Sequence, residues 1–161
     1  MHSHAWVFDQ ATMTNSLPIL ERVFRRQCRS LAQYASESWP WTHRSDREAR
    51  ELVHSIMADE RRWAEQLAAL IAQRGGVPRM GSYPVEFTNS NLHYVALDYM
   101  LRRLAEYLEH NIAALRADLA TASNDAALRS ILEPMIERKG GQVEALRKLA
   151  GTLEQAKIRS Y

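Results

Sequence analysis

The sequence predicts an all-α protein: a four-helix bundle in which one long crossover joins the second and third helices. Two observations carry this prediction. Four long stretches repeat apolar residues every three or four positions, which places these residues on one face of a helix. Of the connections between the stretches, only the second is long, which is the pattern of a bundle with one crossover. We expect residues 1–161 to form one domain.

The first helix is expected over about residues 15–37, after a polar tail at 1–14. Asn15 or Ser16 can cap it, and Pro18 fits its first turn. Gln27 interrupts its apolar stripe. Cys28, the only cysteine, lies toward the edge of the stripe and is interpreted as a packing residue, because no His and Asp partners accompany it. A single cysteine also excludes an internal disulfide.

The segment 38–42 predicts a turn, because Pro40 disfavours helix at the residue before it. Its two tryptophans, Trp39 and Trp41, are expected to cover the end of the bundle. Ser45 and Glu48 then have the spacing of a capping box, so the second helix should span about 45–74.

The second helix carries a carboxylate inside its apolar stripe. The stripe consists of Leu52, Ile56, Trp63, Leu67 and Leu70, and Glu60 falls within it. The following segment, 75–88, contains three glycines and two prolines and is read as the crossover. Fourteen extended residues span roughly 45 Å, which is about the length of a 30-residue helix.

The third helix is expected over about 89–120 and the fourth over about 124–157. Both carry long apolar stripes, and the stripe of the fourth includes two polar residues, Lys139 and Gln142. Pro134 should kink the fourth helix, and Gly140 and Gly141 should weaken it by about 1 kcal/mol each relative to alanine.

The second helix and the turn after it resemble the second helix of bacterioferritins and rubrerythrins, members of the ferritin-like superfamily. In that family a Glu-x-x-His-Ala-x-x-Leu stretch precedes a Gly-x-Pro turn, and here Glu60-Arg-Arg-Trp63-Ala-Glu-Gln-Leu precedes Gly76-Val-Pro78. The first helix resembles the family's first helix, in which a ligating Glu stands seven residues before a Tyr. Residues 136–146 resemble its second Glu-x-x-His helix. The resemblance implies a ferritin-like bundle.

The resemblance also implies a di-iron site of four carboxylates and two histidines, but this chain departs from that ligand set. Glu60 matches the family's second-helix Glu, whereas Trp63 stands at the His position. Gln27 replaces the first-helix Glu, and Lys139 and Gln142 occupy the fourth-helix Glu and His positions. The sequence offers no centred carboxylate on the third helix. A cation at Lys139 would repel metal ions and compete for Glu60.

An alternative keeps a metal in a shifted arrangement, with Glu60 and Glu109 as ligands together with histidines. Glu109 lies about 100° from the centre of the third-helix stripe and Glu106 nearly opposite to it. His54 and His110 are expected on solvated faces, and His93 near the start of the third helix. A further pair, His2 and His4, is expected in the tail.

Two functional hypotheses follow. In the preferred one, the bundle has lost its di-iron ligands, a Glu60–Lys139 ion pair fills its centre with Gln27 and Gln142 as hydrogen-bonding neighbours, and the protein is a non-enzymatic structural, partner-binding or regulatory module without cofactors. In the alternative it is an iron-dependent oxidase or hydroxylase, or an iron-binding protein. Metal analysis of the purified protein discriminates the two.

Composition restricts partners and location. The 21 basic and 19 acidic residues are interspersed, so we expect neither nucleic-acid nor membrane binding. The start of the chain lacks a secretory signal pattern, and cytoplasm is the expected location. By resemblance to related bundles, a homodimer through the first two helices is expected, with Cys28, Val53, Ile71, Trp39 and Trp41 forming a modest apolar patch.

Overall fold

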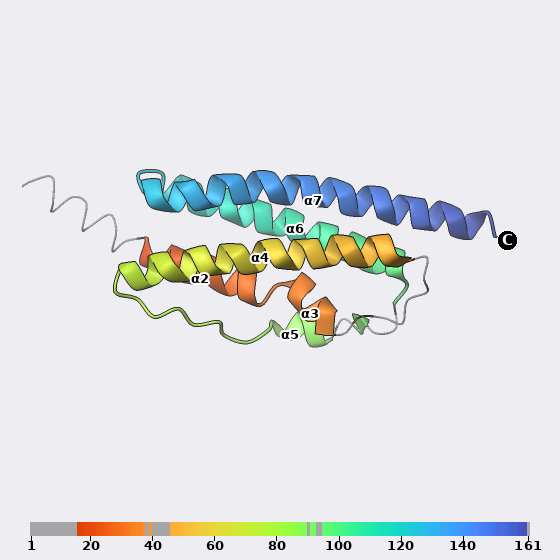
Figure 1. Ribbon diagram of the computed structural model, residues 1–161, viewed down its shortest axis with the longest axis horizontal. Coiled ribbons are helices and arrows are strands. Elements are labelled where there is room, and N and C mark those ends of the chain that lie inside the picture. Colours follow the sequence, from red (N-terminus) through yellow and green to blue (C-terminus); the bar gives the residue numbers. More distant parts are fainter. Residues whose placement is uncertain (1–15, 38, 40–45, 90, 93–94, 161) are drawn as a thin grey trace, which may run out of the picture.

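The computed structural model describes residues 16–37, 39, 46–89, 91–92 and 95–160. Four long segments form the bundle: α2 (Leu17–Cys28) with α3 (Leu31–Glu37), α4 (Arg47–Gln73), α6 (Leu97–Thr121) and α7 (Ala126–Ile158). Figure 1 shows α4, α6 and α7 running along the length of the molecule, with the crossover passing beneath α2 and α3. The predicted all-α bundle with a long crossover between the second and third long helices is confirmed.

The first helix is broken, where the sequence predicted one continuous helix. Helix α2 ends at Cys28, and α3 begins at Leu31. Arg29 has φ −122° and ψ 43°, outside the helical region. Ser30 begins the new helix, because its side-chain oxygen accepts a hydrogen bond from the backbone N–H of Gln33 at 3.1 Å. The break places a hydroxyl at the bundle centre, and a hydrophobic pattern alone does not reveal it.

The crossover is longer than predicted and contains a short helix. It runs from the end of α4 to Leu97, eight residues beyond the Asn89 at which the sequence predicted the third helix to start, and includes α5 (Val85–Thr88). It leaves α4 through Gly75, whose φ of 79° favours glycine. Gly76 is close-packed, since a Cβ there would lie 2.8 Å from Ile71 Cγ2.

Aromatic contacts attach the crossover to the bundle. Tyr83 lies edge-on to Tyr34 with ring centroids 5.3 Å apart, and Phe87 of α5 contacts both Tyr34 and Tyr107 at 5.8 and 5.5 Å. Arg29 donates a hydrogen bond to the carbonyl of Gly81 at 2.9 Å. These contacts hold α5 against α3 and α6.

Helix α7 is continuous from Ala126 to Ile158, through Pro134 and the two central glycines. Asp125 caps it by accepting the backbone N–H of Leu128 at 2.9 Å. Ion pairs of Arg147 with Glu109 at 2.7 Å and of Arg102 with Glu154 at 2.5 Å join α7 to its antiparallel neighbour α6.

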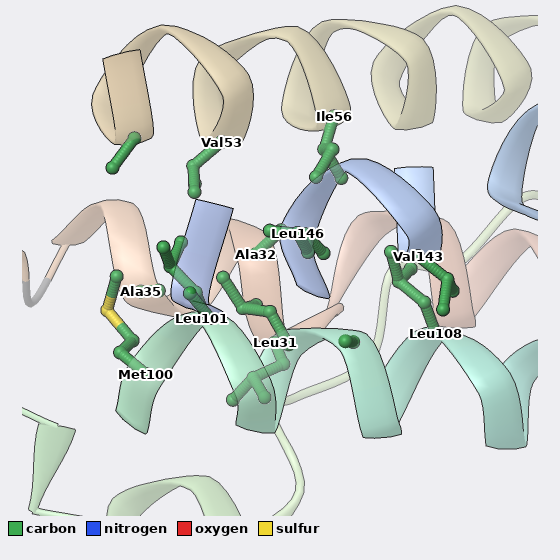
Figure 2. Close-up of a cluster of buried hydrophobic side chains, with 14 of the residues drawn as sticks. Leu31, Ala32, Ala35, Val53, Ile56, Met100, Leu101, Leu108, Val143 and Leu146 are labelled. Carbon is green, nitrogen blue, oxygen red and sulfur yellow. The ribbon is translucent and has the colours of Figure 1, made fainter. Parts of the chain in front are cut away.

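The hydrophobic core consists of two clusters. One is formed by the amino-terminal half of α4 with α3, the crossover, the first part of α6 and the second half of α7. The other is formed by α2, the carboxy-terminal half of α4, the end of α6 and the start of α7. Figure 2 shows the first cluster, in which side chains from α3, α4, α6 and α7 point toward one another. On α4 the first cluster extends to Met57 and the second starts at Trp63, which leaves Glu60 between them.

The apolar patch expected on the first two helices is wrong in its composition. Val53 and Ile71 are fully buried in the core, and Cys28 and Trp39 are partly buried. Trp41 lies outside the described residues. Among the described residues, the exposed large apolar side chains are instead in the crossover and near the ends of α6 and α7: Val77, Met80, Val85, Tyr99 and Ile158. In the part of the chain that the structure describes, no helix is long and apolar enough to cross a membrane.

A buried ion pair clamps the end of α4 to the start of α7. The two terminal nitrogens of the Arg74 guanidinium group donate to Asp125, at 2.6 and 2.8 Å, and both side chains are 3% exposed. Burial raises the pKa of Asp125, but the hydrogen bonds from Arg74 and from the Leu128 backbone outweigh this and lower that pKa to about 2. The clamp therefore stabilises the fold above about pH 4 and is lost as the pH falls toward 2.

We predict that Asp125→Asn, which keeps a capping side chain, removes this acid-sensitive stability. The substitution should lower the free energy of unfolding more at pH 7 than at pH 2.5. The two losses should differ by roughly 2 kcal/mol. Urea unfolding at several pH values measures this difference, with Glu133→Gln on the exposed face of α7 as the control. A difference that stays constant across the range would show that Asp125 does not carry the effect.

Candidate functional site

A layer of polar side chains separates the two hydrophobic clusters at the centre of the bundle. We call it the central polar layer, and its members are each at most 8% exposed: Gln27, Ser30, Gln33, Asp59, Glu60, Lys139 and Gln142. They come from α2, α3, α4, α7 and the break between α2 and α3. The sequence singled out four of them together with Trp63, the indole at the family's His position.

The centre of the layer is an ion pair between α4 and α7. Lys139 Nζ donates to Glu60 Oε1 at 3.5 Å, and neither side chain has any exposed area. Trp63, 5% exposed, contributes its ring face, since Lys139 Nζ lies 5.1 Å from the centroid. The structure thus brings together three of the five positions that the resemblance assigned to ligands.

The second oxygen of Glu60 is bound by the broken helix. Ser30 Oγ donates to Glu60 Oε2 at 2.5 Å, and Gln33 Nε2 donates to the same oxygen at 3.3 Å. Gln33 also donates to the carbonyl of Met57 at 3.1 Å. The carboxylate is therefore contacted from both sides, by an ammonium and by two neutral donors.

Gln27 and Gln142 are buried in the layer but bond elsewhere, contrary to the expectation that they would hydrogen-bond the ion pair. Gln27 Nε2 donates to the carbonyl of Val23 at 3.4 Å, in its own helix. Gln142 Nε2 donates to Asp59 Oδ2 at 2.9 Å. The side-chain oxygens of both glutamines lack a hydrogen-bond partner among the described residues.

Asp59 adds a second carboxylate at the edge of the layer. It accepts hydrogen bonds from Arg62 at 2.8 Å and from Arg138 at 2.8 Å, in addition to the one from Gln142. The two arginines are more than half exposed, whereas Asp59 is buried. This arrangement neutralises Asp59 from the solvent side and leaves Lys139 as the cation that faces Glu60.

The electrostatics of the pair are governed by burial. Burial raises the pKa of Glu60, while the charge of Lys139 and the hydrogen bonds from Ser30 and Gln33 lower it. Burial lowers the pKa of Lys139, while the charges of Glu60 and Asp59 raise it. Each group is thus dependent on its neighbours to remain charged.

Helix α6 contributes two side chains next to the layer. Burial, and after it the charge of Glu60, raises the pKa of Tyr107 to about 12, while hydrogen bonds with Asn111 and the backbone of Leu31 lower it. Asn111 is 6% exposed. No third-helix counterpart of the family's carboxylate was found in the sequence, and the buried polar residue that α6 offers beside Tyr107 is Asn111.

Ser30, Gln33 and Asp59 were not identified from the sequence. Ser30 lies in a helix break that hydrophobic periodicity does not reveal. The direction of the Gln33 side chain depends on the same break, because Gln33 lies in the new helix α3. A signal for Asp59 was present, because it directly precedes Glu60 just as Arg138 directly precedes Lys139. Two adjacent acids on α4 thus pair with two adjacent bases on α7: Asp59 with Arg138, and Glu60 with Lys139.

The structure does not bring together the two carboxylates of the alternative ligand set, Glu60 and Glu109. Glu109 pairs with Arg147 and its side chain is 44% exposed, whereas Glu60 is buried. Glu106 pairs with Arg103 at 2.8 Å on the exposed face of α6. The histidines His54 and His110 are exposed, as predicted, and His93, His2 and His4 lie outside the described residues.

The donor set does not fit a di-metal centre. Hard divalent metals require several carboxylates, and the layer supplies Glu60 facing an ammonium group, which has no lone pair for a metal. Asp59 is engaged by two guanidinium groups and an amide. Across the described ranges, no group of three or more His, Cys, Asp and Glu side chains is placed to hold a metal ion.

We predict that Lys139→Met, which keeps most of the side-chain volume, lowers the free energy of unfolding at pH 7 by roughly 3–5 kcal/mol, because Glu60 is left buried without its cation. The cost should shrink as the pH falls, because a protonated carboxyl is easier to bury. Adding Glu60→Leu to Lys139→Met should recover most of the loss.

Denaturant unfolding of the two single variants and the double variant measures these differences, and Lys148→Met on the exposed face of α7 is the control. The prediction fails if the free energy of unfolding of Lys139→Met lies within about 0.5 kcal/mol of that of the wild type. Lys139 would then have to reach solvent through its flexible side chain rather than pair with Glu60.

Comparison with known proteins agrees with this architecture. A protein-family model described as a ferritin-like domain matches residues 18–157. Neither the comparison with curated proteins nor that with solved structures found a match. The family match covers the long helices except for the first residue of α2 and the last of α7, and it confirms the resemblance seen in the sequence. The chain belongs to the ferritin-like domain family.

Proposed function

We propose that this chain is a ferritin-like domain whose di-iron centre has been replaced by the Glu60–Lys139 ion pair, and that it works without metal as a non-enzymatic structural, partner-binding or regulatory module. One observation carries the proposal. A lysine with no exposed area lies at a position where the family pattern has a ligating Glu, and its ammonium group lies 3.5 Å from the one carboxylate that the pattern retains.

The surrounding contacts support the same proposal. Glu60 uses both oxygens for protein donors, one for Lys139 and the other for Ser30 and Gln33. A metal ion at this carboxylate would have to displace a cation and two hydrogen bonds. Trp63 stands at the position of the family's ligating His, and its larger ring is part of the second hydrophobic cluster.

The competing proposal is an iron-dependent oxidase or hydroxylase, or an iron-binding protein, with Glu60 and Glu109 as shifted ligands. It has weaker support. Glu109 is paired with Arg147 on an exposed face, while Glu60 is enclosed in the core. Bringing both carboxylates to one ion would require rearrangement of α6.

We also propose a homodimer, which rests on the resemblance to related bundles that pair through their first two helices. Light scattering at micromolar concentration should give a mass about twice the monomer's 18.5 kDa. A mass near 18.5 kDa would contradict the dimer and would leave the metal-free centre unaffected.

The metal-free centre can be tested by reversal. The variant Gln27→Glu, Trp63→His, Lys139→Glu and Gln142→His restores the ligand types of the family pattern around Glu60. We predict that it binds Fe(II), Co(II) or Zn(II), while the wild type grown in iron-rich medium purifies with well under one equivalent of metal. Without metal the variant should be less stable by several kcal/mol, because carboxylates approach one another and core volume is lost.

The matched control is the triple variant that keeps Lys139 and carries the other three substitutions. It should bind metal much more weakly than the quadruple variant, because the ammonium group remains at the centre. Elemental analysis and metal-dependent melting temperatures measure both effects. Stoichiometric metal in the wild type, or equal metal binding by the triple and quadruple variants, would contradict the proposal.

A further inference from the structure

A cavity of about 180 Å³ lies between α5 and α6, outside the central polar layer. Its apolar lining comes from three segments of the chain that meet where the crossover packs on the bundle: Leu31, Phe87, Leu92 and Tyr107. Leu31, Phe87 and Leu92 are each less than 9% exposed. The floor of the cavity is therefore part of the packed core rather than a mobile surface.

The size and the shape of the floor suit one aromatic ring. An apolar cavity of about 150 Å³ is large enough to bind benzene. Phe87 and Tyr107 meet edge to face, with centroids 5.5 Å apart and an interplanar angle of 75°. Both residues line the cavity, so a ligand ring placed there would contact them.

The rim of the cavity is charged and carries an excess of negative charge. It is lined by Glu86, Arg103, Glu106 and His110. Arg103 and Glu106 neutralise one another through an ion pair at 2.8 Å. Glu86 is exposed and has no partner among the described residues. His110 Nδ1 donates to the carbonyl of Glu106 at 2.7 Å.

From the apolar floor and the unpaired rim carboxylate we infer that this cavity is a binding site for a small arylalkyl amine, with the ring on Phe87 and Tyr107 and the ammonium group at Glu86. An anionic ligand of the same size would meet the negative charge of Glu86 and be repelled by it. This site is independent of the metal-free centre and does not rest on it.

The experiment uses three probes of similar size on the full chain: 2-phenylethylammonium, neutral ethylbenzene and anionic 3-phenylpropionate. Isothermal titration at low ionic strength should show saturable binding of one 2-phenylethylammonium per chain. The neutral probe should bind more weakly, and the anion more weakly still. The melting temperature should rise with the concentration of the amine.

Glu86→Gln isolates the charge, because residue 86 is exposed and the substitution keeps the side-chain shape. It should weaken binding of the amine by about two- to fivefold and leave ethylbenzene unchanged. Glu137→Gln, an exposed carboxylate on α7 that does not line the cavity, should leave all three affinities unchanged. A second variant, Phe87→Leu, should weaken the amine and the neutral probe together.

Absence of saturable binding of the amine would overturn the inference. So would an anion that binds as tightly as the amine, or an affinity for the amine that Glu86→Gln and Glu137→Gln reduce equally. These outcomes are separate from the metal content of the protein, so the cavity and the centre are tested independently.

Discussion

The constraint on which this structure depends is the burial of two opposite charges, Glu60 and Lys139, at the middle of a bundle. Removing a single ion from water costs several kcal/mol even after the protein relaxes, so neither charge is tolerated alone. Their own contact, at 3.5 Å, is long for a charged hydrogen bond. The remainder of the compensation must come from the neighbours, and the local structure of three helices is arranged to supply it.

The break in the first helix is the clearest consequence. The break after Cys28 lets Ser30 serve two purposes that residue 30 would not combine inside a continuous helix. Its side chain caps α3 and also donates a hydrogen bond to Glu60. Two apolar clusters on either side then seal the layer from water. On the solvent side, Arg62 and Arg138 bind Asp59, and the ion pair of Lys139 is with Glu60. The layer thus contains two groups of hydrogen bonds, one around Glu60 and one around Asp59, while the side-chain oxygens of Gln27 and Gln142 lack partners among the described residues.

Much of this architecture follows from hydrophobic periodicity, because long amphipathic helices bury one stripe each. The same periodicity located Glu60, Lys139, Gln27 and Gln142, since a polar residue inside an apolar stripe must be buried. Periodicity could not place the break at Arg29, because breaking a helix there depends on a tertiary partner, the Glu60 carboxylate. It also assigned residues 89–96 to the third helix, although the aromatic contacts of α5 hold the preceding segment against the bundle and delay the start of α6 to Leu97.

The partners within the layer were the least predictable part. An amide can turn toward any donor or acceptor in reach, so the sequence could not show that Gln142 bonds Asp59 while Gln33 bonds Glu60. The apolar patch on the first two helices failed for a related reason. Val53 and Ile71 lie beside the main stripe, but the helices pack closely enough to bury a wider face than the stripe alone.

The central claim is that Lys139 occupies the place of a metal at Glu60. The most direct measurement is a crystal structure of the wild type grown with Co(II), with anomalous difference maps recorded at the cobalt absorption edge. The account predicts no anomalous peak next to Glu60, and electron density for the Lys139 ammonium group within hydrogen-bonding distance of that carboxylate. An anomalous peak bound by Glu60, with the Lys139 side chain displaced from the centre, would contradict it.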